Sequence, residues 1–441
     1  MDAREAALMA LSESQRQGGW SDAILKKQLA GAALDARDSA LATRLCFGVL
    51  QNRLLLDFYL SHFSNMPLKR MENRVVQVLR LGAYQLLFLD KVPHSAAVNS
   101  AVELTRKHCK NPRAAGMVNG ILRSLERNLD HLPAIPQEDP AAALSLQTSH
   151  PEWLVRSFLE LLGPEEAPLL LEANNSQPPA SAMVNTQKTT AQELSAVLEG
   201  EGIETKLHPW LADCLVLSRT GNLEKSSAFQ RGLFYIQDPA SRLAAAALAP
   251  EPGMRVLDCC AAPGGKSFAA AIAMENRGEV VSCDLHPHKK KLIQAGADRL
   301  GLTCVTPMTA DGRVFRPEWE GVFDRVLVDA PCSGLGVIRK KPDIREKDPE
   351  ALTRLPQVQR AILDTAARYV KPGGVLVYST CTLLPRENEG VVRGFLEGEP
   401  HYKQNPFTLP GPIGRAEGMV TLWPHRHGTD GFFIAKLRRE G

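Results

Sequence analysis

The chain has 441 residues, of which 44% are hydrophobic and 23% are charged, and its formal net charge is +3 at pH 7. This length predicts two to four domains, and the composition is ordinary for a soluble globular protein. No apolar run approaches the roughly 18 residues of a membrane-spanning helix, and the first residues include acidic side chains and no apolar signal core. We therefore expect a cytoplasmic protein with no membrane partner.

The first 130 residues are predicted to be almost entirely helical. In 73–89 apolar side chains recur at helical spacing, a helix restarts near Ser95, and another begins after Asn111-Pro112. This region contains 18 Lys and Arg against 12 Asp and Glu, a net charge of +6. A basic helical bundle of this kind favours a polyanion as partner, with a merely solvated basic surface as the alternative.

The middle of the chain changes character twice. Residues 131–149 are rich in proline and polar side chains, which predicts a linker. Between 150 and 235, strands are expected at 181–185 and 214–218, with a helix at 190–202 between them. This order predicts a small α+β domain.

From residue 236 to 441 short apolar strands alternate with helices. The predicted strands are 254–259, 279–284, 304–308, 325–330, 374–380 and 431–437. The predicted helices are 265–276, 287–300, 350–370 and 386–397. The alternation predicts a doubly wound α/β domain whose sheet is buried on both faces and whose ligands bind at the carboxyl ends of the strands.

The sequence LDCCAAPGGKSF at 257–268 joins the first of these strands to a helix. Glycines at a helix start allow a negative group to approach the exposed N–H groups. The tail GKS is similar to a phosphate-binding loop, but Cys260 stands where that motif has glycine, and the dinucleotide spacing G-x-G-x-x-G is absent. S-adenosylmethionine is therefore the favoured ligand. Its predicted contacts are Cys260, Ala261, Ala262, Pro263, Gly264, Gly265, Lys266, Asp284, Asp311 and Asp329.

Nine cysteines are scattered along the chain without a C-x-x-C pair, so we expect no metal site. Most of them should be small buried hydrophobes. Cys332 in DAPCSG and Cys381 in STCT differ, because each follows the end of a predicted strand. A disulfide between them is the alternative to chemistry, and a reducing compartment disfavours it.

Three motifs carry a specific resemblance: CCAAPGGK, DAPCSGLGVIRKKPD and YSTCTLLPRENE together resemble the RNA cytosine-C5 methyltransferases. The helical region is similar to the NusB fold, and the combination resembles the RsmB-type family of bacterial 16S rRNA methyltransferases over essentially the entire chain. The resemblance implies a NusB-like domain at 1–130, a small RRM-like domain at 150–235 and a Rossmann-like, class I S-adenosylmethionine-dependent methyltransferase domain at 236–441. It implies a monomer that methylates 16S rRNA at a cytosine-967-type site.

The same resemblance implies roles for three side chains. C5 of cytosine becomes nucleophilic only after a thiolate adds to C6, and cysteine suits that step. The family pattern implies that Cys381 attacks C6, that Cys332 assists proton removal and product release, and that Asp329 hydrogen-bonds N3 and the exocyclic amine of the base. To donate to N3, Asp329 must be protonated, which burial would favour. Spacing alone would allow the two cysteines to exchange roles. Lys266 either orients these groups or is only a helix-start lysine.

Basic residues behind the second motif are expected to hold RNA phosphates, with a solvated loop as the alternative. They are Arg339, Lys340, Lys341 and Arg345. The chain departs from the family pattern at Met183, where arginine is frequent, at Glu346, where an aromatic residue is usual, and at Thr382, where serine is common. Two other functions stay open: the same chemistry on tRNA or 23S rRNA, and RNA binding by a regulator with a silent enzyme body.

Overall fold

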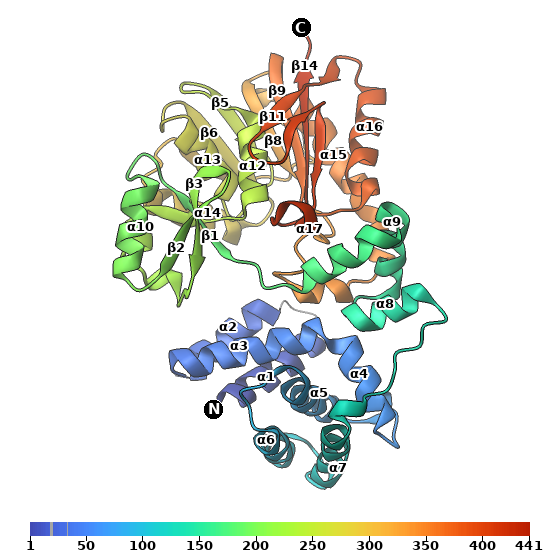
Figure 1. Ribbon diagram of the computed structural model, residues 1–441. Helices are drawn as coiled ribbons and strands as arrows, with labels where there is room; N and C mark the ends of the chain where they lie inside the picture. Colours follow the sequence, from blue (N-terminus) through green and yellow to red (C-terminus); the bar gives the residue numbers. More distant parts are fainter. Residues whose placement is uncertain (18–20, 33) are drawn as a thin grey trace. The chain divides into compact units, whose positions relative to one another are not determined.

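The computed structural model describes residues 1–17, 21–32 and 34–441. The chain divides into two compact units, and Figure 1 shows its course through them. The first unit comprises Met1–Ser176 and Ile338–Lys347, and the second comprises Gln177–Val337 and Asp348–Gly441. The segment Ile338–Lys347 therefore belongs to the first unit, although both of its flanks lie in the second.

The first unit is helical, as its sequence predicts. Its α-helices are α1 (Ala3–Gln17), α2 (Ser21–Ala32), α3 (Ala36–Gln51), α4 (Arg53–His62), α5 (Asn73–Phe88), α6 (His94–His108), α7 (Ala114–Arg127), α8 (Pro140–Thr148) and α9 (Glu152–Asn175). Three short 3-10 helices accompany them: η1 (Leu68–Arg70), η2 (Leu129–His131) and η5 (Pro342–Glu346). Helix α8 lies inside the stretch 131–149, which the sequence predicts to be a linker. In the described part of the chain, no helix combines the length and apolarity that a membrane span requires.

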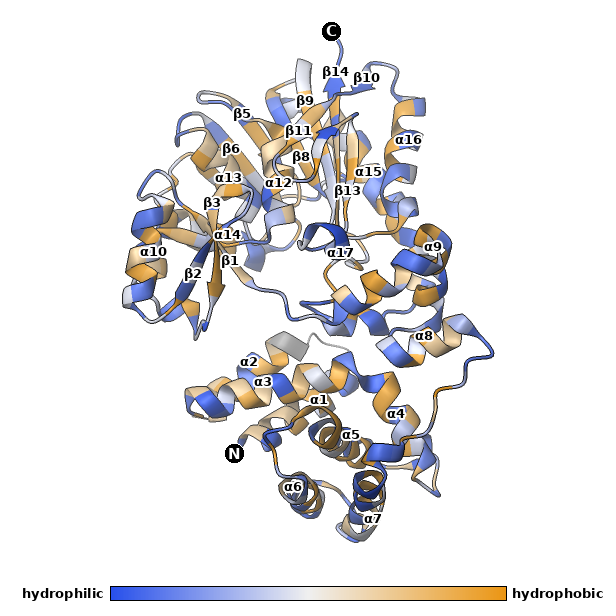
Figure 2. Cartoon of the chain, viewed as in Figure 1, coloured by the Kyte–Doolittle hydropathy of each residue, from blue (hydrophilic) through white to orange (hydrophobic). Residues whose placement is uncertain are grey.

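Helix α5 forms the centre of the helical bundle because every residue from Val75 to Leu86 is buried. Helices α1, α3, α4, α6 and α7 all contact it, and much of its ribbon has the colour of hydrophobic residues in Figure 2. Two glycines permit these close approaches. A Cβ at Gly82 would lie 2.5 Å from the Leu122 side chain, and one at Gly48 would lie 2.0 Å from the Tyr84 ring.

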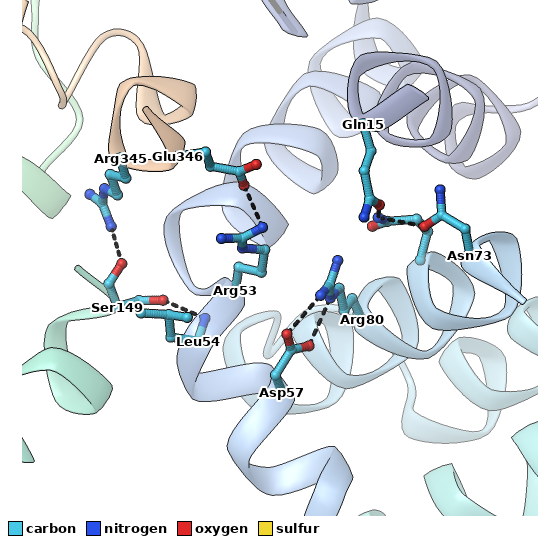
Figure 3. Close-up of polar contacts among 10 residues, drawn as sticks. Gln15, Arg53, Leu54, Asp57, Asn73, Arg80, Ser149, Arg345 and Glu346 are labelled. Atoms are coloured by element: carbon cyan, nitrogen blue, oxygen red, sulfur yellow. Dashed lines mark hydrogen bonds and ion pairs between the residues drawn. The ribbon is translucent and has the colours of Figure 1, made fainter. Parts of the chain in front are cut away.

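Polar contacts connect the helices of this unit at defined points (Figure 3). The Arg80 guanidinium on α5 donates two hydrogen bonds of 2.7 Å to the Asp57 carboxylate on α4. The Leu54 N–H at the start of α4 donates to the Ser149 hydroxyl, 2.8 Å away, just after α8. Buried and partly buried pairs of this kind fix how neighbouring helices align.

A small antiparallel sheet opens the second unit. Its strands are β1 (Ala180–Val184), β2 (Glu204–His208), β3 (Leu211–Ser218) and β4 (Phe234–Ile236), in the order β2-β3-β1-β4. Helix α10 (Ala191–Gly200) begins with a capping box formed by Thr190 and Glu193, and α11 spans Ser227–Gln230. The predicted strand–helix–strand order is confirmed, while β2 and β4 were not predicted. Met183 on β1 is fully buried and packs into the core.

The large sheet has eight strands. They are β5 (Arg255–Asp258), β6 (Glu279–Asp284), β7 (Val305–Thr309), β8 (Phe323–Asp329), β9 (Val370–Thr380), β10 (Tyr402–Gln404), β13 (Met419–Leu422) and β14 (Phe432–Arg439). The order is β10-β14-β9-β8-β5-β6-β7, with β13 paired to β14. A separate hairpin pairs β11 (Phe407–Leu409) with β12 (Gly414–Ala416). All six strands predicted for 236–441 are present.

Helices cover both faces of this sheet, which is why its strands read as continuous apolar runs. These helices are α12 (Pro239–Leu248), α13 (Gly265–Ala273), α14 (Pro287–Leu300), α15 (Leu355–Ala367) and α16 (Glu389–Gly398). The unit also contains the short helix α17 (Pro424–His427) and the 3-10 helices η3 (Leu223–Lys225), η4 (Pro317–Trp319), η6 (Ala351–Arg354) and η7 (Pro385–Glu387). On β9, Val375 and Val377 pack with the core that contains α12. Leu376 and Tyr378 pack with the core that contains α15. Alternate side chains of one strand thus enter opposite layers.

The order of the parallel strands creates a switch point. From β5 the chain continues outward through β6 and β7, and then returns to pair β8 on the other side of β5. In open α/β sheets ligands bind at the carboxyl ends of the strands where the order reverses. Here those ends are Asp258 on β5 and Asp329 on β8.

Candidate active site

Two cysteines meet at this edge of the sheet. Strands β8 and β9 are parallel neighbours, and Asp329 pairs in register with Ser379. The turns that follow the two strands therefore carry Cys332 and Cys381 to the same place, and their Sγ atoms lie 3.4 Å apart. This distance is that of a thiol hydrogen bond, whereas a disulfide has an S–S distance of about 2.05 Å. Both thiols are free.

The surroundings of the two thiols differ in their electrostatic effect. The hydrogen bond from Cys332 lowers the pKa of Cys381, and the Lys266 ammonium lowers it further, while burial and Asp329 oppose this. The same hydrogen bond raises the pKa of Cys332, and burial adds to the rise. The pair thus favours a thiolate on Cys381 and a protonated thiol on Cys332. A thiolate is the nucleophilic form of cysteine.

Lys266 and Asp329 form an ion pair beside the thiols. The Lys266 Nζ lies 2.6 Å from Asp329 Oδ2, and the Ser379 hydroxyl donates to Oδ1 at 2.9 Å. The Lys266 Nζ also lies 5.0 Å from the centroid of the Phe432 ring. The lysine at the start of α13 therefore belongs to the site, and the reading of it as a mere helix-start residue does not fit its position. The Asp329 side chain retains an exposed fraction of 28%.

The glycine-rich loop turns tightly between β5 and α13. The Ala261 N–H donates to the carbonyl of Cys283, and the Gly264 N–H donates to the carbonyl of Ala261, both at 2.7 Å. Gly264 has a φ of +115°, and a Cβ there would lie 2.3 Å from the Phe268 ring. Only glycine fits this conformation in this space. The loop brings the first N–H groups of α13 to the carboxyl end of β5.

Three acidic residues stand at successive strand ends, and Asp258 was not predicted as a site residue. Asp258 is buried, accepts a 2.8 Å hydrogen bond from the Ser267 hydroxyl on Oδ2, and has no hydrogen-bond partner for Oδ1 among the described residues. Burial raises the pKa of Asp258 to about 7. On β6, Asp284 is buried and accepts the His286 N–H at 3.1 Å. Asp258 could have been identified from the sequence by the same signal as Asp284, because each residue ends a strand.

Asp311, two residues beyond β7, is already paired. The Arg313 guanidinium donates to both of its carboxylate oxygens, at 2.9 and 2.7 Å, and lowers the pKa of Asp311. The carboxylate keeps an exposed fraction of 26%. Asp311 lies beyond the carboxyl end of β7, and the Arg313 side chain is its ion-pair partner.

The basic segment behind Cys332 differs from its prediction. Arg345 has an exposed fraction of 3%, and its guanidinium donates to the carbonyls of Gln51, Ser149 and Asn174 at 2.8, 3.1 and 3.2 Å. Burial lowers the pKa of Arg345 to about 9. This guanidinium is enclosed within the first unit, so its position contradicts the predicted contact with RNA phosphate. Arg339 is also buried.

The other two basic residues of the segment, Lys340 and Lys341, are half-buried and exposed, respectively. Glu346, where the family pattern has an aromatic residue, forms an ion pair with Arg53 at 2.9 Å (Figure 3). Thr382 is buried, and its hydroxyl lies 2.6 Å from that of Ser333. A hydrogen bond between Thr382 and Ser333 thus connects the two cysteine turns, and a serine at position 382 also has the hydroxyl for this bond.

Buried polar residues next to the cysteine turns were missed by sequence reasoning. They are Gln359, Ser379, Glu387 and Asn388. Glu387 and Asn388 lie within the quoted motif YSTCTLLPRENE, but nothing in their spacing indicates what they contact. Among the described residues, no group of three or more His, Cys, Asp or Glu side chains is arranged to hold a metal ion.

Three family models match successive parts of the chain. The NusB family matches residues 1–127, the RsmF/B-like ferredoxin-like domain matches 150–224, and the family described as 16S rRNA methyltransferase RsmB/F matches 245–438. The matches follow the helical, small α+β and α/β regions in that order.

Curated relatives match over nearly the full chain. The protein of Bacillus subtilis (strain 168) named probable ribosomal RNA small subunit methyltransferase B is 40% identical over 99% of both chains. The ribosomal RNA small subunit methyltransferase B of Vibrio cholerae is 36% identical over 92% of this chain and 90% of its own.

Two solved structures are similar to this chain in fold. The crystal structure of PH0851 superimposes with a TM-score of 0.84 at 28% identity, covering 99% of this chain and 98% of the other. NSun6 from Pyrococcus horikoshii, crystallised with SFG, has a TM-score of 0.58 at 25% identity and covers 66% of this chain.

Proposed function

The chain belongs to the RsmB/F family of 16S rRNA methyltransferases, and from that premise we propose that it methylates C5 of a cytosine in small-subunit rRNA with S-adenosylmethionine as donor. The observation that carries the proposal is the pair Cys332–Cys381, with sulfurs 3.4 Å apart beside the Lys266–Asp329 ion pair. Two free thiols with opposite pKa shifts suit a reaction that needs one nucleophile and one proton-handling group. The target would be the family's cytosine-967-type site.

The residues at the switch point fit the proposed donor. A glycine-rich helix start suits a carboxylate, Asp284 at the end of β6 suits ribose hydroxyls, and the unpartnered Oδ1 of Asp258 is a buried acceptor without a donor of its own. When bound, S-adenosylmethionine supplies an electrophilic methyl group. The protein's part is to hold that group at the carboxyl ends of β5 and β6, next to the base.

The first step falls to Cys381. Its thiolate adds to C6 of cytosine, forming an S–C6 bond, and the electron pair of the C5=C6 bond makes C5 nucleophilic. In this proposal Asp329 accepts a hydrogen bond from the exocyclic amine of the base, and the Lys266 ammonium, 2.6 Å from that carboxylate, is the donor for the N3 side. The donor that the sequence reasoning sought in a protonated Asp329 is thus available from Lys266.

The second step falls to Cys332. After C5 has gained the methyl group, the proton on C5 must leave, the C5=C6 bond re-forms and the S–C6 bond breaks, returning the thiolate to Cys381. Cys332, whose Sγ lies 3.4 Å from the attacking sulfur, is the group to which we assign this proton. Once the Cys381 sulfur is bonded to C6, it no longer carries the charge that raises the pKa of Cys332 in the free protein, so Cys332 releases its proton to solvent. The resulting thiolate takes the C5 proton, and the reaction as a whole releases one proton.

Tritium release from 5-tritiated cytosine in a 16S rRNA fragment tests the proposal. Replacing Cys381 with alanine removes the nucleophile, so we expect release to fall to background with unchanged RNA binding. Normal turnover by the Cys381→Ala protein would exclude the covalent route. If the chain were an RNA-binding protein without activity, the unmodified protein would also release no tritium. Comparing rRNA with tRNA fragments decides between those substrates.

Replacing Cys332 with alanine should separate attack from release. The thiolate of Cys381 can still add to C6, but the C5 proton has no acceptor, so a covalent RNA–protein adduct should accumulate on a denaturing gel. The double variant Cys332→Ala/Cys381→Ala should form none. An adduct in the Cys381→Ala protein instead would mean that the two roles are exchanged.

A further inference from the structure

The turn η7 (Pro385–Glu387) and the residue after it lie against both cysteine turns. Glu387 and Asn388 have exposed fractions of 0% and 1%, so neither side chain faces solvent. Burying a carboxylate and an amide costs free energy unless hydrogen bonds within the protein replace those lost to water. Their partners are backbone and side-chain atoms on either side of the two cysteines.

Glu387 holds the turn that carries Cys332. Its Oε2 accepts the Ser333 N–H at 2.9 Å and the Gln359 side-chain amide, also at 2.9 Å. The same Gln359 amide donates to the carbonyl of Pro331 at 3.0 Å. The residues immediately before and after Cys332 are thereby fixed by one carboxylate–amide pair.

Asn388 holds the turn that carries Cys381 in the same way. Its Oδ1 accepts the Thr380 hydroxyl at 2.5 Å, and its Nδ2 donates to the carbonyl of Thr382 at 3.0 Å. These are again the residues immediately before and after the cysteine. The backbone carbonyl of Glu387 accepts the Tyr378 hydroxyl at 2.6 Å, which fastens η7 to β9.

Resting on the function proposed above, we infer that Glu387 and Asn388 are positioning residues that set the separation of the two sulfurs, Glu387 through the Cys332 turn and Asn388 through the Cys381 turn. Because they are adjacent in the chain, and the bond from Tyr378 fastens η7 to β9, one segment supports both cysteine turns through separate contacts. The two residues act on different steps: Glu387 on release and Asn388 on attack.

The experiment measures tritium release and covalent adduct side by side in Glu387→Leu, Gln359→Leu and Asn388→Leu proteins. A displacement of about 1 Å at a reacting group costs up to roughly 100-fold in rate, so we expect tritium release to fall by about 10- to 100-fold in all three. Adduct should accumulate in Glu387→Leu and Gln359→Leu, as in Cys332→Ala, because only release is impaired. It should stay at the wild-type level in Asn388→Leu, because attack itself is impaired.

Asn185→Leu is the matched control. Asn185 is fully buried and donates two hydrogen bonds to backbone carbonyls, those of Gly232 and Leu300, away from the cysteines. It should lower the melting temperature without changing the ratio of adduct to product. If a leucine variant does not fold, Glu387→Gln and Asn388→Asp, which each keep one of the hydrogen bonds, replace it, and smaller changes in the same directions are expected.

The inference is overturned if Glu387 and Asn388 variants show the same ratio of adduct to product as Asn185→Leu, or if adduct accumulates in the Asn388 variant instead. Failure of the proposed function looks different. In that case the Cys332→Ala protein itself forms no adduct, whatever the behaviour of the Glu387 and Asn388 proteins.

Discussion

At the scale of single residues, the neighbours of two chemically identical thiols decide which of them ionises. The charge of Lys266 lowers the pKa of Cys381 and so favours the thiolate there. Cys332 is disfavoured as a thiolate by its hydrogen bond to Cys381, by burial, and by the charge of Glu387. The opposite directions of the two pKa shifts therefore favour Cys381 as the nucleophile of the proposed reaction.

Lys266→Met should shift the pH–rate profile. Lys266 lowers the pKa of Cys381, so its removal raises that pKa, and the rising limb of single-turnover methylation moves to higher pH. Activity at pH 7 should fall about 10-fold or more and recover in part as the pH is raised.

Lys371→Met is the control for this shift. Lys371 pairs with Asp324 at 2.7 Å near the starts of β9 and β8, the two strands whose carboxyl ends lead into the cysteine turns. Its removal therefore deletes a comparable ion pair far from the thiols. A profile that moves equally in both variants, or that stays in place in Lys266→Met, contradicts the role assigned to Lys266.

At the scale of elements, the 3-10 helix η5 is bound to the first unit through its buried arginine. Arg345 donates to backbone carbonyls at the ends of α3, α8 and α9, and Ile344 beside it is also buried. Carbonyls at helix ends lack partners within their own helix, and a guanidinium supplies several donors at once. One side chain thus joins the ends of three helices.

Arg345→Met should destabilise the first unit by about 2–4 kcal/mol, because several buried carbonyls lose their donor. Differential scanning calorimetry, with hydrogen exchange in α8 and α9, measures the change. Lys341→Met is the matched variant, since it removes an exposed cation from the same segment. If Arg345→Met melts normally but binds rRNA more weakly, the phosphate contact expected from the sequence would be restored.

At the scale of the whole molecule, charge is unevenly distributed. The first 130 residues carry a net charge of +6, whereas the entire chain carries +3. Lys110 and Arg113 flank an exposed turn between α6 and α7. Phosphate contacts made by such side chains depend strongly on salt, because binding releases counterions.

Reversing both charges, as Lys110→Glu/Arg113→Glu, should weaken binding of a 16S rRNA fragment and reduce the slope of log affinity against log salt by about 2. Filter binding over a range of about 50 to 300 mM salt measures both the affinity and the slope. Lys403→Glu/Arg415→Glu, exposed residues of the second unit, provide the control. An unchanged slope would place the RNA contacts elsewhere.

Local patterns in the sequence determined the elements and the kind of chemistry. Helical spacing in 73–89 marks α5, six short apolar runs mark six strands of the large sheet, and Cys332 and Cys381 stand out because each follows such a run. The prediction did not find the edge strands β2 and β4, since β2 is largely exposed and β4 has only three residues. Both lack the long apolar pattern on which strand prediction depends.

Only the tertiary structure decided which side chains meet. The Cys332–Cys381 contact joins residues 49 apart, the Lys266–Asp329 pair joins residues 63 apart, and the bond from Arg345 to Gln51 joins residues 294 apart. No local periodicity encodes such pairings, because they depend on the order of β5, β8 and β9 in the sheet and on how helices end. For the same reason the sequence showed two candidate thiols but not their surroundings: Glu387 bonds the Ser333 N–H in the Cys332 turn, and Asn388 bonds Thr380 and Thr382 in the Cys381 turn.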